Sequence, residues 1–530
     1  MTDVDVVVVG YGPGGEMLAS LLGRAGHRVL VFEQFPEPYG LPRMSTLDGE
    51  IARLLQHASD ASKALEDSLP QPYGYMYGAD DKLAVRHEWD FTLCGHPSHL
   101  SLHQPNIEAA MDERIASFAN VEVRWGTTVT SVDDLGDAVR VTARTSVGTG
   151  SEATEQQVTA RYVVGMDGAN STVRNTLGID VDVIRQHDDQ WFLTDFDILD
   201  PAIAEPATEI HMDPRQPYYW GPNGARRCRT DVKVVGNVDP STQLDHEHGY
   251  AWLENRIGIP RNKVRITRRV LYRFRSQIAA SFRKGRIFLG GDAAHAMTPH
   301  MAQGSCSAMR DGANISWKFD LVLRGLADES LLDSYETERM KHVLPFIHGS
   351  LAAWAATSEE NPDAAAQRDA FMRSGNFTVP PIPPLPDGIL QRDESGAVRA
   401  PAGSLSPQGV VVIDSREALL DDIVGFGFQL VTTVPLDEVL KEPHRQLLEA
   451  IGAHVVVLGD GPGQTRDVEG TYRDFLGAHG ATAYLSRPDL YLFGIADGAA
   501  ATADLVAELG RQLSLVETTA DRPDLEEVAL

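Results

Sequence analysis

A glycine-rich turn lies between two hydrophobic runs near the start of the chain. Gly10, Gly12 and Gly15 follow a run of valines, and Glu33 ends the next hydrophobic run. This order predicts strand, turn, helix and strand over residues 4–34, with a diphosphate bound at the turn and helix N-terminus and a ribose hydroxyl bound by the acid. The acid favours an unphosphorylated ribose, which indicates FAD or NAD rather than NADP.

Two further acids end short hydrophobic runs, and both are followed by loops. Asp167 is followed by glycine in "GMDGANSTVR", and Asp292 follows glycine in "GGDAAHAM". A carboxylate such as Asp292 can accept a hydrogen bond from a ribityl hydroxyl, and a helix beginning near Gly304 can stabilise negative charge on a reduced flavin. Asp292 could instead simply cap a turn. The three motifs together, in this order, favour FAD.

With these motifs the sequence resembles the single-component (class A) FAD-dependent aromatic hydroxylases, the family of p-hydroxybenzoate hydroxylase. Arg43 in "LPRMST" and Gln104 also match family positions, and the resemblance covers roughly residues 4–355. The pattern is most similar to that of the 3-(3-hydroxyphenyl)propionate hydroxylases, through "DPRQPYYW", "GDAAHAM" and "SAMRDGANISWK".

The resemblance implies both a reaction and a cofactor site. NADH or NADPH reduces FAD, O₂ reacts to give a flavin C4a-hydroperoxide, and a phenolic ring is hydroxylated ortho or para to its hydroxyl, without a metal. The expected FAD-binding residues are Gly10, Gly12, Pro13, Gly14, Gly15, Glu33, Gln34, Arg43, Gln104, Val129, Asp167, Asp292, Pro299, Gln303, Gly304, Ser305 and Cys306.

Four positions depart from the family pattern. Met301 and Ala302 replace glycines, which stiffens the loop, and Cys306 replaces an asparagine; neutral drift is the alternative explanation. Glu16 stands where relatives carry leucine. The helix dipole favours its charge but the FAD phosphates repel it, so we expect its side chain to turn away from them and Glu16→Leu to bind FAD at least as tightly.

The elements that must position these residues are those of an α/β protein. We expect a Rossmann-like FAD-binding domain interleaved with an antiparallel-sheet substrate domain, followed by a C-terminal domain that resembles the thioredoxin-like tail of the phenol hydroxylase branch. That tail has no cysteine, which excludes a redox role and leaves packing or dimerisation. The expected boundaries are 1–72, 104–180 and 276–355 for the FAD domain, 73–103 and 181–275 for the substrate sheet, 356–407 for a helical and proline-rich linker, and 408–530 for the tail.

The substrate pocket is expected between the flavin and the sheet of residues 181–275. The candidate substrate-binding residues are His211, Tyr218, Tyr219, Arg226, Cys228, His300 and Met301. Among them His211 or Tyr218 could take the phenol proton, with Pro299 beside the flavin, and an arginine could hold a substrate carboxylate. Each of these side chains could instead simply pack in the sheet.

Composition limits the partners and the compartment. The chain has 530 residues and a formal net charge of −28, which disfavours nucleic acid and anionic membranes. Its 3 cysteines are scattered and suggest neither a zinc site nor disulfides, which fits a reducing cytoplasm. There is no membrane-length apolar run. The expected partner is a small phenol, and a homodimer is left open.

The substrate stays open at this level. An arylpropionate such as 3-(3-hydroxyphenyl)propionate is the first choice, and a polycyclic aromatic in antibiotic tailoring is the second. A flavin oxidoreductase that does not hydroxylate is a further alternative. A flavin-dependent halogenase is disfavoured, because no two tryptophans lie two residues apart as in the W-x-W-x-I-P segment of halogenases.

Overall fold

The structure is a computed structural model that describes residues 2–145, 154–236, 239–378, 381–435 and 441–515. Its first sheet has the strand order β10-β2-β1-β13-β12-β11, with β20 and β19 joined beside β13. The strands are β1 (Val4–Val9), β2 (Val29–Phe32), β10 (Val121–Arg124), β11 (Thr127–Asp134), β12 (Val139–Thr145), β13 (Thr154–Gly165), β19 (Arg283–Lys284) and β20 (Ile287–Leu289).

Five strands of this sheet are parallel, because β10 also pairs in parallel with β2, and the carboxyl ends of the other four position the glycine turn and the acidic motifs. β1 pairs in parallel with β2 and β13, and β13 pairs in parallel with β20. Gly10, Glu33, Asp167 and Asp292 follow these four strands within a few residues. They therefore meet at one edge of the sheet, where ligands bind in open α/β folds.

Helices cover this sheet, and two of them approach closely through glycines. α1 (Pro13–Arg24) packs on α7 (Gly304–Leu323), and a Cβ on Gly14 would lie 2.9 Å from the carbonyl oxygen of Ala308. The neighbouring helices are α2 (Gly49–Ala58), α3 (Ala61–Ala64), α4 (Gln104–Ala116) and α5 (Thr172–Leu177).

The second sheet has the order β21-β18-β14-β17-β16-β15-β5-β6 and is antiparallel except where β5 meets β15. Its strands are β5 (Tyr73–Tyr77), β6 (Leu83–Glu88), β14 (Val181–Ile198), β15 (Thr208–His211), β16 (Tyr218–Pro222), β17 (Arg227–Lys233), β18 (Val264–Ala279) and β21 (His295–Ala296). One face packs on an apolar cluster that includes Phe196, Trp220 and Val232, beside α6 (His246–Trp252). The other face is turned toward the first sheet's edge.

The sequence over residues 46–66 predicts a helix, whereas the structure has a short strand followed by the two helices α2 and α3. β3 (Thr46–Asp48) comes first and pairs with β9 (His99–Ser101), which also pairs with β4 (Leu69–Pro70); β7 (Thr92–Leu93) pairs with β8 (His96–Pro97). The helix then breaks because two aspartates cap new starts: Asp48 accepts from the Ile51 N–H, and Asp60 accepts from the Ser62 N–H.

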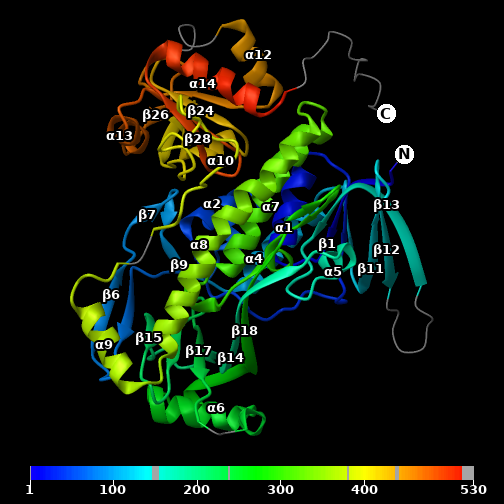
Figure 1. Ribbon diagram of the computed structural model, residues 1–530. Helices are drawn as coiled ribbons and strands as arrows, with labels where there is room; N and C mark the ends of the chain where they lie inside the picture. Colours follow the sequence, from blue (N-terminus) through cyan, green and yellow to red (C-terminus); the bar gives the residue numbers. More distant parts are fainter. Residues whose placement is uncertain (1, 146–153, 237–238, 379–380, 436–440, 516–530) are drawn as a thin grey trace.

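The chain after residue 332 runs along the molecule and ends in a separate α/β layer (Figure 1). The long helix α8 (Asp333–Ser358) follows α7 along the chain, and α9 (Pro362–Arg373) comes after it and lies against β6 of the second sheet. The C-terminal elements are β22 (Val410–Ile413), β23 (Arg416–Leu419), α10 (Leu420–Val424), β24 (Gln429–Thr432), α12 (Glu442–Ala450), β25 (His454–Val457), β26 (Arg466–Asp467), α13 (Thr471–Ala478), β27 (Ala483–Ser486), β28 (Leu492–Ala496) and α14 (Gly498–Gln512).

Buried ion pairs hold the C-terminal layer on the rest of the chain. Arg487 contacts Glu338 of α8 at 2.7 Å, and Arg53 of α2 contacts Asp421 at 2.6 Å. All four side chains are almost fully buried. Among the helices of the described segments, none has both the length and the apolar character needed to cross a membrane.

Candidate active site

A cavity of about 2020 Å³ opens between the two sheets. Its walls come from the glycine turn, the segment after β2, the second sheet, the loop before α7, and the segments 381–384 and 404–405. Single-ligand sites reach roughly 1,000 Å³. The cavity is therefore large enough for a dinucleotide and a second ligand.

The glycine turn fits an FAD diphosphate. Gly10 has φ +102°, which favours glycine, and a Cβ on Gly15 would overlap the carbonyl oxygen of Gly10. A Cβ on Gly12, by contrast, would meet no protein atom within 4 Å, and Gly12 lines the cavity. Two glycines thus serve the fold, and the open side of Gly12 leaves room for a ligand beside the N-terminus of α1.

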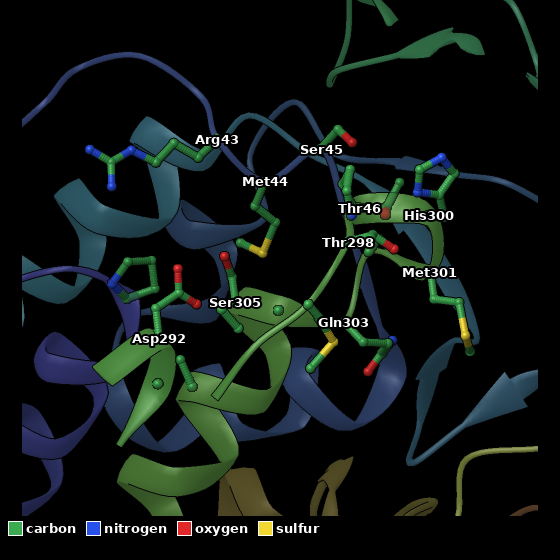
Figure 2. Close-up of a pocket in the computed structure, with 18 of the residues that line it drawn as sticks. Arg43, Met44, Ser45, Thr46, Asp292, Thr298, His300, Met301, Gln303 and Ser305 are labelled. Carbon is green, nitrogen blue, oxygen red and sulfur yellow. The ribbon is translucent and has the colours of Figure 1, made fainter. Parts of the chain in front are cut away.

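The acids at the strand ends also face the cavity. Glu33 accepts hydrogen bonds from the backbone N–H of Tyr11 (2.8 Å) and of Phe35 (2.9 Å), which fixes its carboxylate beside the turn. Asp292 projects into the cavity, to which its side chain is exposed, and desolvation by the surrounding protein raises its pKa (Figure 2). Asp167 has a buried Oδ1 with no partner among the described residues, a polar atom that a ligand hydroxyl would satisfy.

The segment around Arg43 forms the facing wall (Figure 2). Gln104 Oε1 accepts from the backbone N–H groups of Arg43 (2.7 Å) and Met44 (2.6 Å), and the guanidinium of Arg229 donates to the carbonyl oxygen of Arg43 at 2.7 Å. The Arg43 side chain stays exposed, 4.4 Å from the Tyr39 ring centroid. In this arrangement Gln104 positions the segment, and Arg43 is available to an anionic ligand.

Contacts with α7, with Asp48 and with α8 hold the loop before α7 in place. Ala302 has φ +54°, a left-handed conformation that is unusual for alanine, and Cys306 Sγ donates to its carbonyl oxygen at 3.4 Å. The side-chain amide of Gln303 accepts a hydrogen bond from the Arg310 guanidinium at 2.8 Å and donates one to the Asp48 carboxylate at 3.2 Å. Met301 packs on Gly349 of α8, where an added Cβ would lie 2.7 Å from its sulfur.

The structure brings the expected cofactor residues together with one exception. Gly10, Gly12, Pro13, Gly14, Gly15, Glu33, Gln34, Arg43, Gln104, Val129, Asp167, Asp292, Pro299, Gln303, Gly304 and Ser305 all line the cavity. Cys306 does not line it: its side chain is fully buried against Met309 and Ala313 in an apolar cluster. The reason is helical periodicity, because residue 306 of α7 faces the protein interior.

The expected substrate residues divide between those that line the cavity and those that do not. Tyr219, His300 and Met301 line the cavity. The side chains that do not line the cavity, all of them within the described residues, are His211, Tyr218, Arg226 and Cys228. We therefore remove these four from the candidate site.

Strand alternation and local contacts explain the placement of these four. Tyr218 and Cys228 belong to the apolar cluster behind the sheet, because side chains alternate between faces along a strand. His211 stacks on Tyr218, with ring centroids 4.2 Å apart, on that same side. The Arg226 guanidinium donates to the carbonyl oxygens of Ile203 (2.9 Å) and Asp200 (2.6 Å) in a turn.

Sequence reasoning missed a polar group on the cavity face that includes Asp231, Thr208 and Trp191. Asp231 Oδ1, Thr208 Oγ1, Trp191 Nε1 and the Tyr219 hydroxyl are buried and, among the described residues, have no partner in hydrogen-bonding geometry. Thr208 and Ser45 lie near the Tyr219 hydroxyl. Strand pairing was the signal that could have identified Asp231, because it stands directly opposite Tyr219, which was already a candidate.

Burial raises the pKa values of the two titratable members of this group, Asp231 and Tyr219. It raises the pKa of Asp231 to about 6, opposed by the nearby positive charge of Arg229. Burial, and then the charge of Asp231, raise the pKa of Tyr219 to about 12. At neutral pH the carboxylate is thus an acceptor of moderate basicity, and the phenol of Tyr219 remains a donor.

The family profile described as "FAD binding domain" matches residues 3–348, more than half of the chain. The probable NADH-specific resorcinol 4-hydroxylase of Rhodococcus jostii (strain RHA1) is 35% identical over 96% of this chain and 94% of its own length. The chain belongs to the family of FAD-dependent aromatic hydroxylases. This confirms the resemblance seen in the sequence, and FAD is its cofactor.

Other relatives of this hydroxylase agree. The 3-(3-hydroxy-phenyl)propionate/3-hydroxycinnamic acid hydroxylase of Mycobacterium sp. (strain JLS) is 32% identical over 81% of this chain and 76% of its own length. Residues 403–512 match the "HcaD C-terminal domain" family. Within the described residues, no group of three or more His, Cys, Asp or Glu side chains has the arrangement of a metal site.

Solved structures show the same fold over nearly the whole chain. The flavin-dependent monooxygenase PieE, in complex with FAD and substrate, has a TM-score of 0.78 and 20% identity, covering 97% of this chain and 100% of that chain. Aklavinone-11 hydroxylase, in a complex with FAD and aklavinone, has a TM-score of 0.78 and 22% identity, covering 97% and 99%. At these identities the likeness concerns the fold alone.

Proposed function

We propose that this hydroxylase uses NADH and O₂ to hydroxylate a small phenol with a second polar substituent, ortho or para to its hydroxyl. We further propose that the ring binds on the cavity face of the second sheet, at Tyr219, Asp231 and Thr208. Bound FAD would supply hydride acceptance and oxygen transfer at the Gly10–Gly15, Asp167 and Asp292 side of the cavity. The protein's own residues would bind the ring, orient it and take its proton.

The cluster of unsatisfied polar atoms carries this proposal. Buried polar groups are nearly always hydrogen-bonded, and an unmade bond costs about 1–3 kcal/mol. Asp231 Oδ1, the Tyr219 hydroxyl and Thr208 Oγ1 make no hydrogen bond of good geometry among the described residues, although Thr208 and Ser45 lie near the Tyr219 hydroxyl, and Asp231, Tyr219 and Thr208 all line the cavity. A ligand with hydroxyl groups would satisfy them, whereas an apolar ring would leave them unpaired.

The roles of Asp231 and Tyr219 follow from their ionisation. A phenol hydroxyl that donates to Asp231 can pass its proton to that carboxylate, since the pKa of Asp231 is raised to about 6. The Tyr219 hydroxyl keeps its proton, so it can donate a hydrogen bond to an oxygen substituent of the substrate ring as that oxygen becomes negative. Both residues stand on paired strands, so the sheet sets their separation.

The names of the relatives narrow the substrate class. Resorcinol and 3-(3-hydroxyphenyl)propionate are both phenols with a second substituent meta to the hydroxyl. The guanidinium of Arg229, the buried arginine of this wall, already donates to Asp195 (2.7 Å) and to the Arg43 and Pro42 carbonyl oxygens (2.7 and 2.6 Å). The carboxylate of an arylpropionate would therefore need another arginine of the cavity wall, such as Arg86 or Arg273. The higher identity to the resorcinol hydroxylase is what favours a resorcinol-like ring as the first substrate to test.

The test is turnover with matched phenols. FAD-loaded protein is mixed with NADH or NADPH and with resorcinol, 3-(3-hydroxyphenyl)propionate or a polycyclic phenol, and nicotinamide oxidation, hydroxylated product and H₂O₂ are measured together. We expect resorcinol to accelerate NADH oxidation with product formed in equal amount. If every phenol yields only H₂O₂, or if only the polycyclic phenol is hydroxylated, the proposed substrate class is wrong.

We also propose the domain organisation predicted from the sequence, in which a thioredoxin-like tail packs on the rest of the chain and transfers no electrons. We further propose that the enzyme is cytoplasmic and can form a homodimer. The sharing of one sheet by β5, β6 and β14–β18 supports an interleaved substrate domain. The segment 381–384 of the expected linker lines the cavity, so we assign it a second role as a wall. The expected tail extends beyond residue 515 into a segment outside the described residues.

A further inference from the structure

Glu16 is an acid buried in the first turn of α1, beside the glycine turn. Its side chain is only 3% exposed, and Glu16 contributes to the wall of the cavity. Its Oε2 has no hydrogen-bond partner among the described residues. A buried carboxylate without a partner is costly to keep charged, which makes this position unusual for an acid.

Other acids surround Glu16 on the elements that pack against α1. Glu108 and Asp112 lie on α4, and Glu33 lies at the end of β2; the charges of all three act on Glu16. Burial, followed by these three carboxylates, holds the pKa of Glu16 well above its usual range. Burial likewise raises the pKa of Glu108.

The positive and donor groups nearby are used by other members of the cluster. The Tyr11 hydroxyl donates to Asp112 at 2.8 Å, and the Gln104 amide donates to Glu108 at 2.7 Å. The positive charge of Arg43 acts on Glu108. Among the described residues, the partial positive charge of the α1 N-terminus is what favours ionised Glu16, and that same charge is what a diphosphate would use.

We propose that FAD binds when Glu16 is protonated, so that cofactor binding is linked to the uptake of a proton at Glu16. A diphosphate beside Gly12 adds negative charge to a cluster that already holds four acids. The proton removes one of these charges and gives Glu16 an O–H donor toward the cofactor or the cavity water. FAD binding therefore weakens as rising pH removes the proton from the cofactor-free protein.

The experiment measures FAD affinity of the full chain without NADH or phenol, through the change in flavin fluorescence. The range is about pH 6 to about pH 9, in which ordinary carboxylates and tyrosines keep one form. We expect the Kd of the unaltered protein to rise with pH, by up to about tenfold per unit where Glu16 titrates. Glu16→Gln, which keeps a neutral donor, should bind with a Kd that is flat over this range.

Two further variants make the result specific. Glu16→Leu, which has no titrating group, should also show a flat Kd and should bind at least as tightly as the unaltered protein at the alkaline end. Glu113→Gln removes a charge of α4 that is exposed and paired with Lys63 at 2.6 Å, and it should keep the pH dependence of the unaltered protein. The proposal is overturned by a flat Kd in the unaltered protein, or by a pH dependence that survives in Glu16→Gln.

Discussion

Tyr219 and Asp231 stand directly opposite each other on β16 and β17, and both side chains line the cavity. Their immediate strand neighbours, Tyr218 and Val232, face the apolar cluster on the other side of the sheet. The pairing places a donor and an acceptor side by side on one face of the sheet, within the cavity. It also makes the roles of the two residues separable by mutation.

Asp231→Asn should remove the proton acceptor. We expect kcat to fall by about 10²–10⁴-fold, the usual contribution of a general base. In the unaltered enzyme, activity should decline as pH falls through about 6, because the carboxylate becomes protonated there. Steady-state pH profiles check both points. Asp197→Asn, at a partly exposed ion pair with Arg265 on the same sheet, is the control; an unchanged acidic limb in Asp231→Asn would contradict the assignment.

Gly12 and Gly15 should respond differently to the same added methyl group. Gly12→Ala is expected to fold with unchanged stability as the cofactor-free protein, because its Cβ meets no protein atom within 4 Å, yet to bind FAD at least about tenfold more weakly. Gly15→Ala should instead lower the free energy of unfolding by about 1–3 kcal/mol, because its Cβ overlaps the Gly10 carbonyl oxygen. Denaturant titration and FAD titration of both variants separate the two effects, and equal stabilities would refute this distinction.

Ala302 should tolerate glycine but not a branched residue. Its φ of +54° lies in the left-handed region, so Ala302→Val is expected to lower the free energy of unfolding by about 1–3 kcal/mol. Ala302→Gly should stay within about 1 kcal/mol of the parent, since relief of strain is offset by greater freedom of the unfolded chain. Urea unfolding of both proteins gives the comparison. A valine variant as stable as the glycine variant would show that the loop adjusts without strain.

Arg487 should prove essential for attachment of the C-terminal layer. Its fully buried guanidinium pairs with Glu338 and Asp489 at 2.7 and 2.6 Å. Arg487→Met removes the cation of Asp489 and leaves Glu338 with Lys318, at 2.8 Å, as its remaining cation among the described residues. We expect a loss of about 3–5 kcal/mol in unfolding free energy, measured by chemical denaturation. Lys341→Met removes an exposed pair with Asp387 and should cost at most about 1 kcal/mol. Similar losses in the two variants would mean that burial does not set the strength of the Arg487 network.

Much of the cofactor site could be predicted because its determinants are local in sequence. Gly10, Gly12 and Gly15 act within one turn, and Glu33 ends the strand that follows the same helix, so spacing alone indicates a dinucleotide site. Asp292 belongs to an equally local strand-and-loop pattern. The sequence did not indicate that the helix expected over 46–66 would divide into α2 and α3, since this depends on Asp48 and Asp60 acting as N-caps.

The candidate substrate wall depended on the tertiary structure. Tyr218 and Tyr219 are adjacent and chemically alike, and only the register of β16 decides which of them faces the cavity, since a shift of one residue reverses every side chain. Asp231 gained its role from a strand partner 12 residues away, and its raised pKa arises from burial that no local pattern encodes. The sequence by itself thus determined the family and its FAD cofactor. Pairing between strands and burial between the sheets decided which side chains of the second sheet line the cavity.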